Sequence, residues 1–205
     1  MNEKTIPDII VGRLPLYLRA LQHMVVENRR TASSQELSER LGISAAQIRK
    51  DLSQFGEFGK QGTGYEISYL IQELLKILKV DKTWDIVVIG AGDIGSAIAR
   101  NLDFTDRGYH VSMVFDNDPQ KINTMVGPFM VKDSRSIVDT IQKAGIKLAL
   151  IAVPVVQAQE VADQLVKAGV KAILNYAPIS INVPPDVRVQ YVDPIVHLQR
   201  MSYYL

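Results

Sequence analysis

The sequence predicts an α/β protein built from two domains and a terminal helix, and three observations support this. Apolar residues recur at helical spacing before residue 80, and short β-branched runs alternate with amphipathic segments after it. The stretch "WDIVVIGAGDIGSAIARNLDF", residues 84–104, has the order of a buried strand, a glycine turn and a helix. We therefore expect an N-terminal winged-helix (helix-turn-helix) domain over residues 1–80, a C-terminal Rossmann-like doubly wound parallel sheet over residues 81–193, and a terminal helix over residues 194–205.

The composition restricts the function classes. The chain has 205 residues, 47% of them apolar, and a formal net charge of +1. It has no cysteine, so disulfides, thiolate metal sites and thiol redox switches are excluded, and we expect no metal site. No apolar run approaches the ~20 residues that span a bilayer, and the N-terminus lacks the pattern of a signal peptide. We expect a cytoplasmic protein with no membrane partner.

The first long helix is expected to begin at Pro15, because proline lacks only an N–H that the first helical turn leaves unpaired. Its buried face is expected to comprise Leu14, Leu18, Leu21 and Val25.

Two short helices joined by a tight turn follow. Ser33 and Glu36 form a capping box at the start of the first helix, and Gly42 ends it. Ser44 and Gln47 repeat the capping pattern at the start of the second helix. This arrangement indicates a helix-turn-helix. The buried sides are expected to comprise Leu37, Leu41, Ile48, Leu52 and Phe55.

A glycine-rich segment over residues 55–68 then predicts a β-hairpin with its tip at residues 60–63, and a helix over residues 69–80 follows. A hairpin after a helix-turn-helix is the winged-helix arrangement. The second helix of such a motif enters the major groove of DNA, and the hairpin tip and the first long helix can hold the backbone. The residues expected to contact double-stranded DNA are Arg13, Arg19, Ala46, Gln47, Arg49, Lys50, Ser53, Gln54, Lys60 and Gln61.

The second part of the chain alternates strands and helices. The strands are continuous apolar runs, as expected for buried parallel strands. They are expected at residues 85–90, 110–115, 147–153, 170–174 and 187–192. Helices are expected at residues 94–102, 134–143 and 155–167, and from residue 194 to the end of the chain.

The glycine turn predicts a dinucleotide site. Gly90 allows the tight turn, Gly92 lets the backbone approach a pyrophosphate, and Gly95 lets the helix pack on the strand. Asp116 ends the second strand, where an acid accepts from both ribose hydroxyls and favours NAD(H) over NADP(H). The expected phosphate loop comprises Gly90, Ala91, Gly92, Asp93, Ile94 and Gly95. The nicotinamide slot is expected to comprise Ala152, Val153, Pro154, Asn175, Ala177 and Pro178.

Three functions remain open at this point. The first is a DNA-binding protein that senses NADH and NAD⁺. The second is a small NAD-dependent oxidoreductase with an appended interaction domain, in which Tyr176 would be the candidate proton donor, although the sequence has no recognisable catalytic pattern. The third is a DNA-binding protein that senses another nucleotide, such as a CoA ester.

The last helix is unusually apolar. Asp193 can cap it and Pro194 suits its first position. It either packs on its own sheet or inserts into a partner subunit, and the pattern favours neither.

The blocks "RLPLYLRAL", "AAQIRKDLSQFGEFGKQGTGY", "VVIGAGDIGSAIA", "VFDNDP", "LNYAPI" and "YVDP" occur in this order over nearly the whole chain. With these blocks the chain resembles the redox-sensing transcriptional repressor Rex family. The resemblance implies a homodimer with a swapped terminal helix that binds a palindromic operator, is released by NADH, and binds DNA when NAD⁺ is present. It also implies DNA contacts at Arg19, Arg49, Lys50 and Gln61.

Two positions depart from the pattern of the family. Some relatives carry a basic residue where this chain has Asp93, and a tyrosine where it has Asn101. The resemblance implies that the position of Asn101 links cofactor state to the swapped helix, near Asp193 of the partner. It therefore implies that the coupling between cofactor state and the swapped helix is weaker in this chain or is made by other residues.

Overall fold

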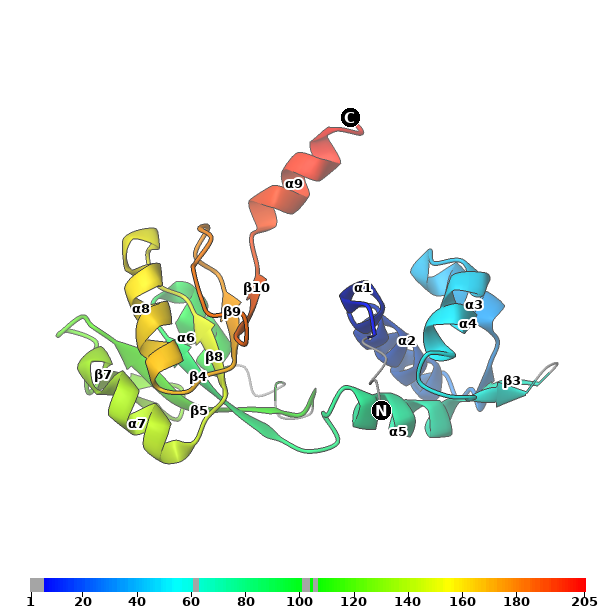
Figure 1. Ribbon diagram of the computed structural model, residues 1–205, viewed down its shortest axis with the longest axis horizontal. Coiled ribbons are helices and arrows are strands. Elements are labelled where there is room, and N and C mark those ends of the chain that lie inside the picture. Colours follow the sequence, from blue (N-terminus) through cyan, green and yellow to red (C-terminus); the bar gives the residue numbers. More distant parts are fainter. Residues whose placement is uncertain (1–5, 61–62, 101–103, 105–106) are drawn as a thin grey trace. The chain divides into compact units, whose positions relative to one another are not determined.

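The computed structural model describes residues 6–60, 63–100, 104 and 107–205 (Figure 1). The chain divides into two compact units, Met1–Lys82 and Thr83–Leu205. Each has its own buried apolar core. None of the helices within the described residues combines the length and apolarity that crossing a bilayer requires.

The first unit packs helices around one core and adds a small antiparallel sheet in the strand order β1-β3-β2. Its helices are α1 (Asp8–Val11), α2 (Leu14–Val26), α3 (Ser34–Leu41), α4 (Ala45–Leu52) and α5 (Ile67–Ile77). Its strands are β1 (Thr31–Ala32), β2 (Gly59–Lys60) and β3 (Gly64–Glu66). The winged-helix prediction is confirmed in its main elements, and the short helix α1 was not expected.

Helix α2 begins one residue before Pro15, and its buried face overlaps only in part with the one expected, which had Leu14 and Leu21 right. Its buried residues are Leu14, Tyr17, Ala20, Leu21 and Met24. Val25 is exposed and Leu18 is only half-buried, so this part of the prediction was wrong. The sequence pattern allowed two overlapping stripes, and the tyrosine and the methionine made the one that packs.

The capping predictions for the helix-turn-helix hold in the structure. Ser33 and Glu36 make both bonds of the capping box on α3, and Gly42 ends this helix in the left-handed conformation. Ser44 accepts from the backbone N–H of Gln47 at the start of α4. The second box is incomplete, because the side chain of Gln47 donates elsewhere.

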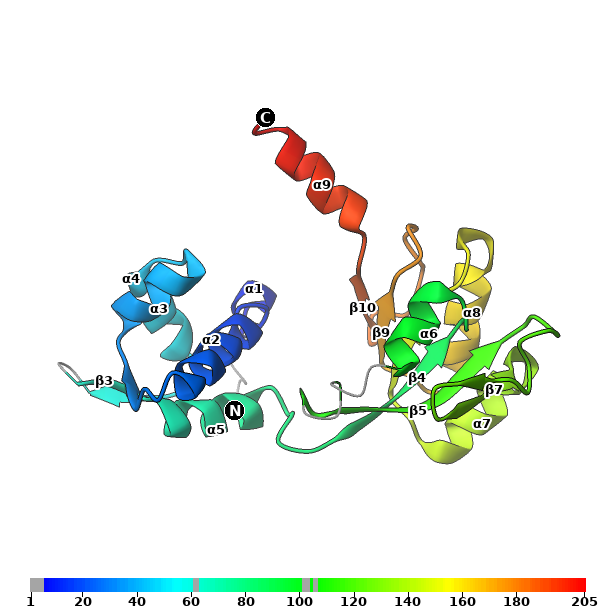
Figure 2. The same cartoon turned by 180° about the vertical axis from the view of Figure 1, so that it is seen from behind.

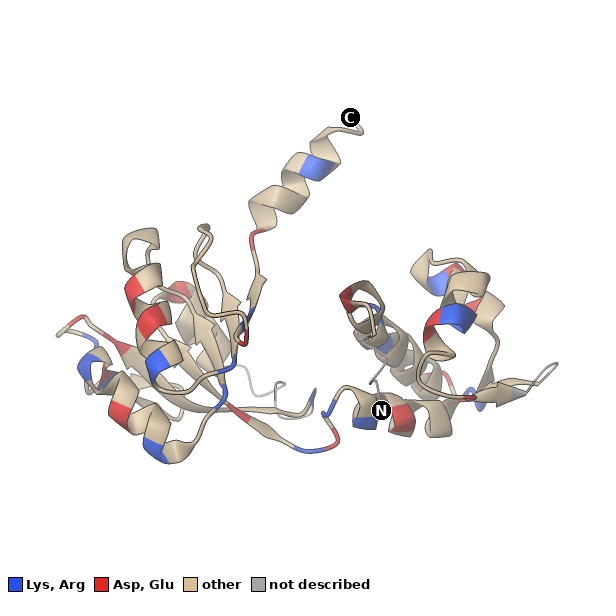
Figure 3. Ribbon diagram, in the orientation of Figure 1, with Lys and Arg blue, Asp and Glu red and all other residues tan. Residues whose placement is uncertain are grey.

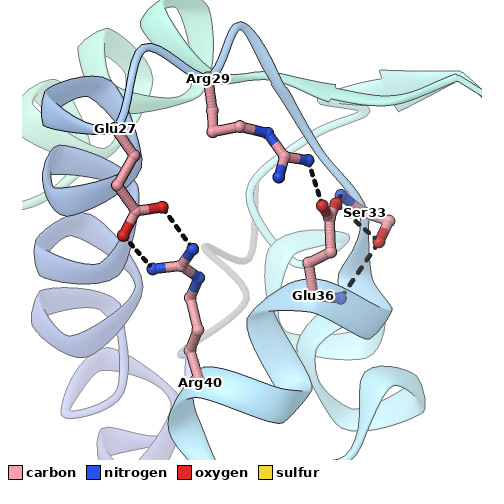
Figure 4. A network of polar contacts seen from close by, with 5 residues as sticks. All are labelled: Glu27, Arg29, Ser33, Glu36 and Arg40. Atoms are coloured by element: carbon pink, nitrogen blue, oxygen red, sulfur yellow. Dashed lines mark hydrogen bonds and ion pairs between the residues drawn. The ribbon is translucent and has the colours of Figure 1, made fainter.

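Figure 4 shows a polar network that joins the end of α2 to α3. Arg40 makes a bidentate pair with Glu27, with N···O distances of 2.5 and 2.8 Å. Arg29 pairs with Glu36, which also closes the capping box with Ser33. These side chains are partly exposed, so solvent screens the network.

The second unit is a seven-stranded sheet in the order β10-β9-β8-β4-β5-β7-β6. Its strands are β4 (Trp84–Ile89), β5 (Tyr109–Asp116), β6 (Met125–Val126), β7 (Phe129–Asp133), β8 (Leu148–Ile151), β9 (Ala172–Asn175) and β10 (Arg188–Tyr191). Its helical segments are α6 (Asp93–Arg100), the 3₁₀ turn η2 (Ser134–Ser136), α7 (Ile137–Ala144), α8 (Val155–Lys167) and α9 (Pro194–Ser202).

All pairings in this sheet are parallel except that of β6 with β7. Figures 1 and 2 show α7 and α8 on one face of the sheet and α6 on the other, which gives three layers. The order from β7 to β10 is the 3-2-1-4-5-6 order of dinucleotide-binding sheets, so the predicted doubly wound sheet is confirmed. The strands β6 and β7 were missed, because their apolar runs are short.

Candidate nucleotide-binding cavity and DNA-facing surface

The three glycines of the turn after β4 do different work. Gly90 has a φ of +103°, and a Cβ there would lie 2.3 Å from the carbonyl oxygen of Ala152. A Cβ at Gly95 would lie 1.8 Å from the carbonyl oxygen of Gly90. A Cβ at Gly92 would meet no described atom within 4 Å. The fold therefore requires glycine at positions 90 and 95, whereas Gly92 leaves open space.

That open space is part of a cavity of about 510 Å³ beyond the carboxyl ends of β4, β5 and β8. The volume is in the range of small-molecule and cofactor sites. The position is the switch point of the sheet, where ligands of such folds bind. The lining residues are Ile89, Gly90, Gly92, Asp93, Ile94, Asp116, Asn117, Asp118, Lys121, Ser134, Ala152, Val153, Pro154, Gln157, Glu160, Val161 and Gln164.

Asp116 lies at the end of β5 and faces this cavity although it is only 7% exposed. Its carboxylate accepts from the backbone N–H of Ala91 at 2.7 Å and from that of Asp118 at 2.8 Å. Burial alone would raise the pKa of Asp116, but these bonds and the nearby Lys121 outweigh it and hold the pKa below its usual value. Asp116 is thus an ionised acceptor fixed at the cavity wall.

Asp93 and Ile94 form the first turn of α6, and both are exposed and line the cavity. A carboxylate at a helix N-terminus interacts favourably with the helix dipole. The same N-terminus offers N–H groups to a phosphate. Asp93 therefore competes with any anion that approaches the loop.

The predicted nicotinamide slot divides in two. Ala152, Val153 and Pro154 line the cavity. Asn175 is 1% exposed. Its side-chain amide donates to the carbonyls of Ala177 and Ile179 and accepts from the backbone N–H of Ala177. These hydrogen bonds hold the backbone of the loop that follows β9. Of the predicted slot, the residues absent from the described cavity lining are Asn175, Ala177 and Pro178, and the candidate proton donor Tyr176 is absent from it too.

Sequence reasoning missed several residues of the cavity wall. Those on α8 recur at helical spacing, which is a signal that could have found them: Gln157, Glu160 and Gln164. Lys121 lies in a turn five residues after Asp116, and no signal in the sequence indicated that it lines the cavity. Across the described residues, no group of three or more potential metal ligands occurs.

Helix α4 is the second helix of the helix-turn-helix, the predicted recognition helix, and several of its polar side chains are exposed. Arg49 is exposed and donates to the hydroxyl of Ser34 on α3 at 2.8 Å, which holds the guanidinium across the two helices. Ser53 caps the end of α4 by donating to the carbonyl of Lys50. The exposed members of the predicted set on and just after α4 are Ala46, Arg49, Lys50, Ser53 and Gln54.

Two members of the predicted DNA-contacting set have other partners in the structure. Arg13 donates twice to the carboxylate of Asp51, at 2.6 and 2.7 Å. Gln47 donates to the same carboxylate at 2.6 Å, and the hydroxyl of Tyr17 donates at 2.6 Å. Asp51 itself is fully buried on α4. Arg13 and Gln47 therefore share a buried carboxylate, and their contact with DNA stays a prediction.

The network fixes the ionisation of Asp51. Burial alone would raise its pKa, but the hydrogen bonds from Arg13, Tyr17 and Gln47 outweigh it, and the pKa lies below its usual value. The pKa of Tyr17 is raised, first by burial and then by its bond to Asp51. A buried carboxylate with four donors joins the recognition helix to α2.

The remaining predicted positions lie in different places. Arg19 is exposed and lines a surface groove between α2 and α3 with His23 and Arg40. Lys60 belongs to β2. Gln61 and Asn101 lie outside the described residues.

The terminal helix α9 begins as expected. Asp193 accepts from the backbone N–H of Ile195, and Pro194 occupies the first turn. Arg200 is the one Lys, Arg, Asp or Glu residue of α9, and the helix is otherwise tan in Figure 3. All of residues 194–205 are exposed. The exposed large apolar side chains are Ile195, Val196, Leu198, Met201, Tyr203, Tyr204 and Leu205.

A winged helix and a Rossmann-like sheet in one chain define a class, that of DNA-binding proteins with a nucleotide-binding regulatory domain. Two family models match: "Putative DNA-binding protein N-terminus" over residues 5–53 and "CoA binding domain" over residues 81–179. The redox-sensing transcriptional repressor Rex of Chloroflexus aggregans is 48% identical and that of Carboxydothermus hydrogenoformans 40%, each over 97% of this chain and 94% and 95% of the relative. The chain belongs to the Rex family of redox-sensing transcriptional repressors.

Solved structures agree with this assignment. A crystal structure of RSP in complex with β-NAD⁺ and operator DNA is 38% identical, with a TM-score of 0.93, over 98% of this chain and 93% of the other. RSP in complex with β-NADH gives a TM-score of 0.90 at 36% identity, over 98% and 95%. The family is one of transcriptional repressors, not enzymes, so the oxidoreductase interpretation is set aside.

Proposed function

We propose that this protein is a homodimeric repressor that binds a palindromic operator in the cytoplasm and leaves it when NADH fills the cavity behind Gly92. One observation carries the proposal: a single chain joins a recognition helix to an open cavity walled by the ionised Asp116. The similar structure that holds both β-NAD⁺ and operator DNA supports this pairing of ligands.

The DNA would be read by the exposed side of α4. Arg49 suits guanine and Gln54 suits adenine, and Lys50 suits a phosphate. Arg49 is pre-oriented by Ser34, which lowers the entropy lost on binding. The hairpin of β2 and β3 and the exposed Arg19 would contact the flanking backbone.

The dimer would be made through α9. Seven large apolar side chains over residues 195–205 face solvent in the single chain. A surface of this kind is normally covered, and insertion into a second copy would cover it. Two recognition helices would then face half-sites about 34 Å apart, one turn of DNA.

The redox response would come from the charge of the nicotinamide. NAD⁺ carries a positive charge on the ring and NADH does not. Where the slot is walled by Ala152, Val153 and Pro154, the oxidised ring loses more hydration energy on entry. NADH would bind more tightly and favour the dimer form that misaligns the recognition helices. A full shift needs about 5.5 kcal/mol of differential binding.

The test is a gel-shift titration of operator DNA with NADH and with NAD⁺, beside analytical ultracentrifugation of the free protein. We expect a dimer, release by NADH, and retention with NAD⁺. Equal release by the two forms, or a monomer at working concentration, would reject the proposal. A thermal-shift panel that includes CoA esters tests the other nucleotide class, and a larger shift with a CoA ester than with NADH would favour it.

A further inference from the structure

The charged side chains of the cavity are unevenly distributed. The acids on its wall are Asp93, Asp116, Asp118 and Glu160. Among the described residues of this wall, Lys121 is the one basic side chain. Its ammonium lies 3.5 Å from Asp116 Oδ2 and 4.0 Å from Asp118 Oδ2. The ammonium of Lys121 therefore lies next to the carboxylate of Asp116, which is expected to bind the adenosine ribose.

The two partners of this pair differ in freedom. Asp116 is held by the backbone N–H groups of Ala91 and Asp118, one on each oxygen. The side chain of Lys121 is 40% exposed and makes a long, imperfect contact with it. A lysine has a flexible stem and a point charge, so it can turn to a nearby anion. Asp116 cannot move away without breaking two hydrogen bonds.

An acid at this position binds the ribose 2′-hydroxyl, whereas a cation nearby accommodates a 2′-phosphate. Here both occur within 3.5 Å of each other. We propose that Lys121 determines specificity: it lets the cavity accept dinucleotides with a 2′-phosphate, such as NADPH, while Asp116 opposes them. This rests on the proposed binding of NAD(H) in the cavity. The preference for NADH over NADPH is then a balance of two side chains.

The experiment measures the dissociation constants of NADH and NADPH by their fluorescence on the full chain. The variants are Lys121→Gln, Asp116→Asn, both together, and Lys143→Gln. Lys143 is exposed at the end of α7 and outside the described cavity lining, so it is a control with the same charge change. The quantity of interest is the ratio of the NADPH to the NADH dissociation constant.

We expect Lys121→Gln to raise this ratio about tenfold, because a charge-assisted bond to phosphate is lost while the ribose contacts remain. Asp116→Asn should lower the ratio about tenfold, because the repelling charge is removed. In the Asp116→Asn background, loss of Lys121 should weaken NADPH about tenfold and NADH less than about twofold. Lys143→Gln should leave the ratio unchanged.

Other outcomes are decisive too. If Lys121→Gln weakens both cofactors equally, Lys121 only neutralises its acidic neighbours and the inference falls. If NADH binds but NADPH binds neither the wild type nor Asp116→Asn, the inference falls while the proposed function stands. If NADH does not bind the wild type, both fall. Trp84 fluorescence in urea checks that each variant is folded.

Discussion

Asp51 in the first unit and Asp116 in the second are both buried, but their carboxylates are stabilised by different kinds of hydrogen-bond donors. Asp51 and Asp116 are 0% and 7% exposed, and both have a lowered pKa. Asp51 receives four hydrogen bonds, all from side chains, and one of its donors is the guanidinium of Arg13. Asp116 receives two from the backbone and one long contact from Lys121, and it borders a cavity.

The difference separates a structural from a binding carboxylate. A carboxylate offers about four acceptor positions. Those of Asp51 are all in use, so it can join α2 to α4 but accept nothing more. Asp116 has capacity left on the side that faces the cavity. A lowered pKa is common to both sites, and only the partners and the open space distinguish them.

The largest effect is expected from Asp51→Ala. It leaves the guanidinium of Arg13 and the hydroxyl of Tyr17 without their partner in the core, and breaking such a pair costs about 3–5 kcal/mol. Asp116→Ala frees two backbone N–H groups beside a cavity that water can enter, so we expect about 1–2 kcal/mol.

The losses of stability in Asp51→Ala and Asp116→Ala can be measured separately. The single tryptophan, Trp84, lies in β4 and reports the second unit, while far-UV circular dichroism reports the helices of both. Asp51→Ala should lower the urea midpoint of the helical signal and leave the tryptophan transition in place. Equal losses for the two variants would mean that the closed and open sites do not differ in kind.

Much of the fold followed from local chemistry. The capping residues Ser33 and Ser44 and the terminating Gly42 gave the helix-turn-helix its boundaries. The turn from Gly90 to Gly95 placed the first strand and helix of the sheet, because close backbone contacts there admit only glycine. These features depend on neighbours within a few residues, which a sequence displays directly.

The sequence did not predict which partners the polar side chains have in the fold. The partners of Asp51 could not be predicted from the sequence, since Arg13 is 38 residues away in the chain. Arg13 and Gln47 both donate to the carboxylate of Asp51, and their contact with DNA stays a prediction. Asn175 stays a predicted cofactor contact, but its side chain bonds its own loop, which was not foreseen. A polar side chain near a predicted site can form hydrogen bonds within the protein rather than with a ligand. Its hydrogen-bond partners in the structure show which of the two it does.

The second prediction uses the open space at Gly92. Gly92→Ala should change the free energy of unfolding by less than about 1 kcal/mol, because the new methyl meets no described atom. It should weaken NADH at least about tenfold, because the methyl occupies the approach of the pyrophosphate. Ala97→Ser, on the exposed side of α6, is the control. Unchanged NADH affinity would show that the ligand does not approach this loop.

The third prediction concerns acid. Both aspartates have a folded-state pKa below the unfolded value of about 3.9. Their contribution to stability is therefore complete above that value and is lost as the pH falls through the lower folded-state pKa. We expect the urea midpoint to fall as the pH drops below about 4. Asp116→Ala should show a smaller acid dependence in the Trp84 transition, and an identical dependence would contradict the assignment.

The smallest effect is expected where charges pair in solvent. Glu27 and Arg40 form a bidentate pair like that of Arg13 with Asp51, yet the Glu27 side chain is 47% exposed (Figure 4). Water solvates both groups when the pair breaks, so Glu27→Gln should barely move the urea midpoint, and added salt should remove the difference. The geometry of the two pairs is alike, so a loss as large as that of Asp51→Ala would mean that geometry outweighs burial. If the loss is small, burial is what makes Asp51 indispensable to the recognition helix.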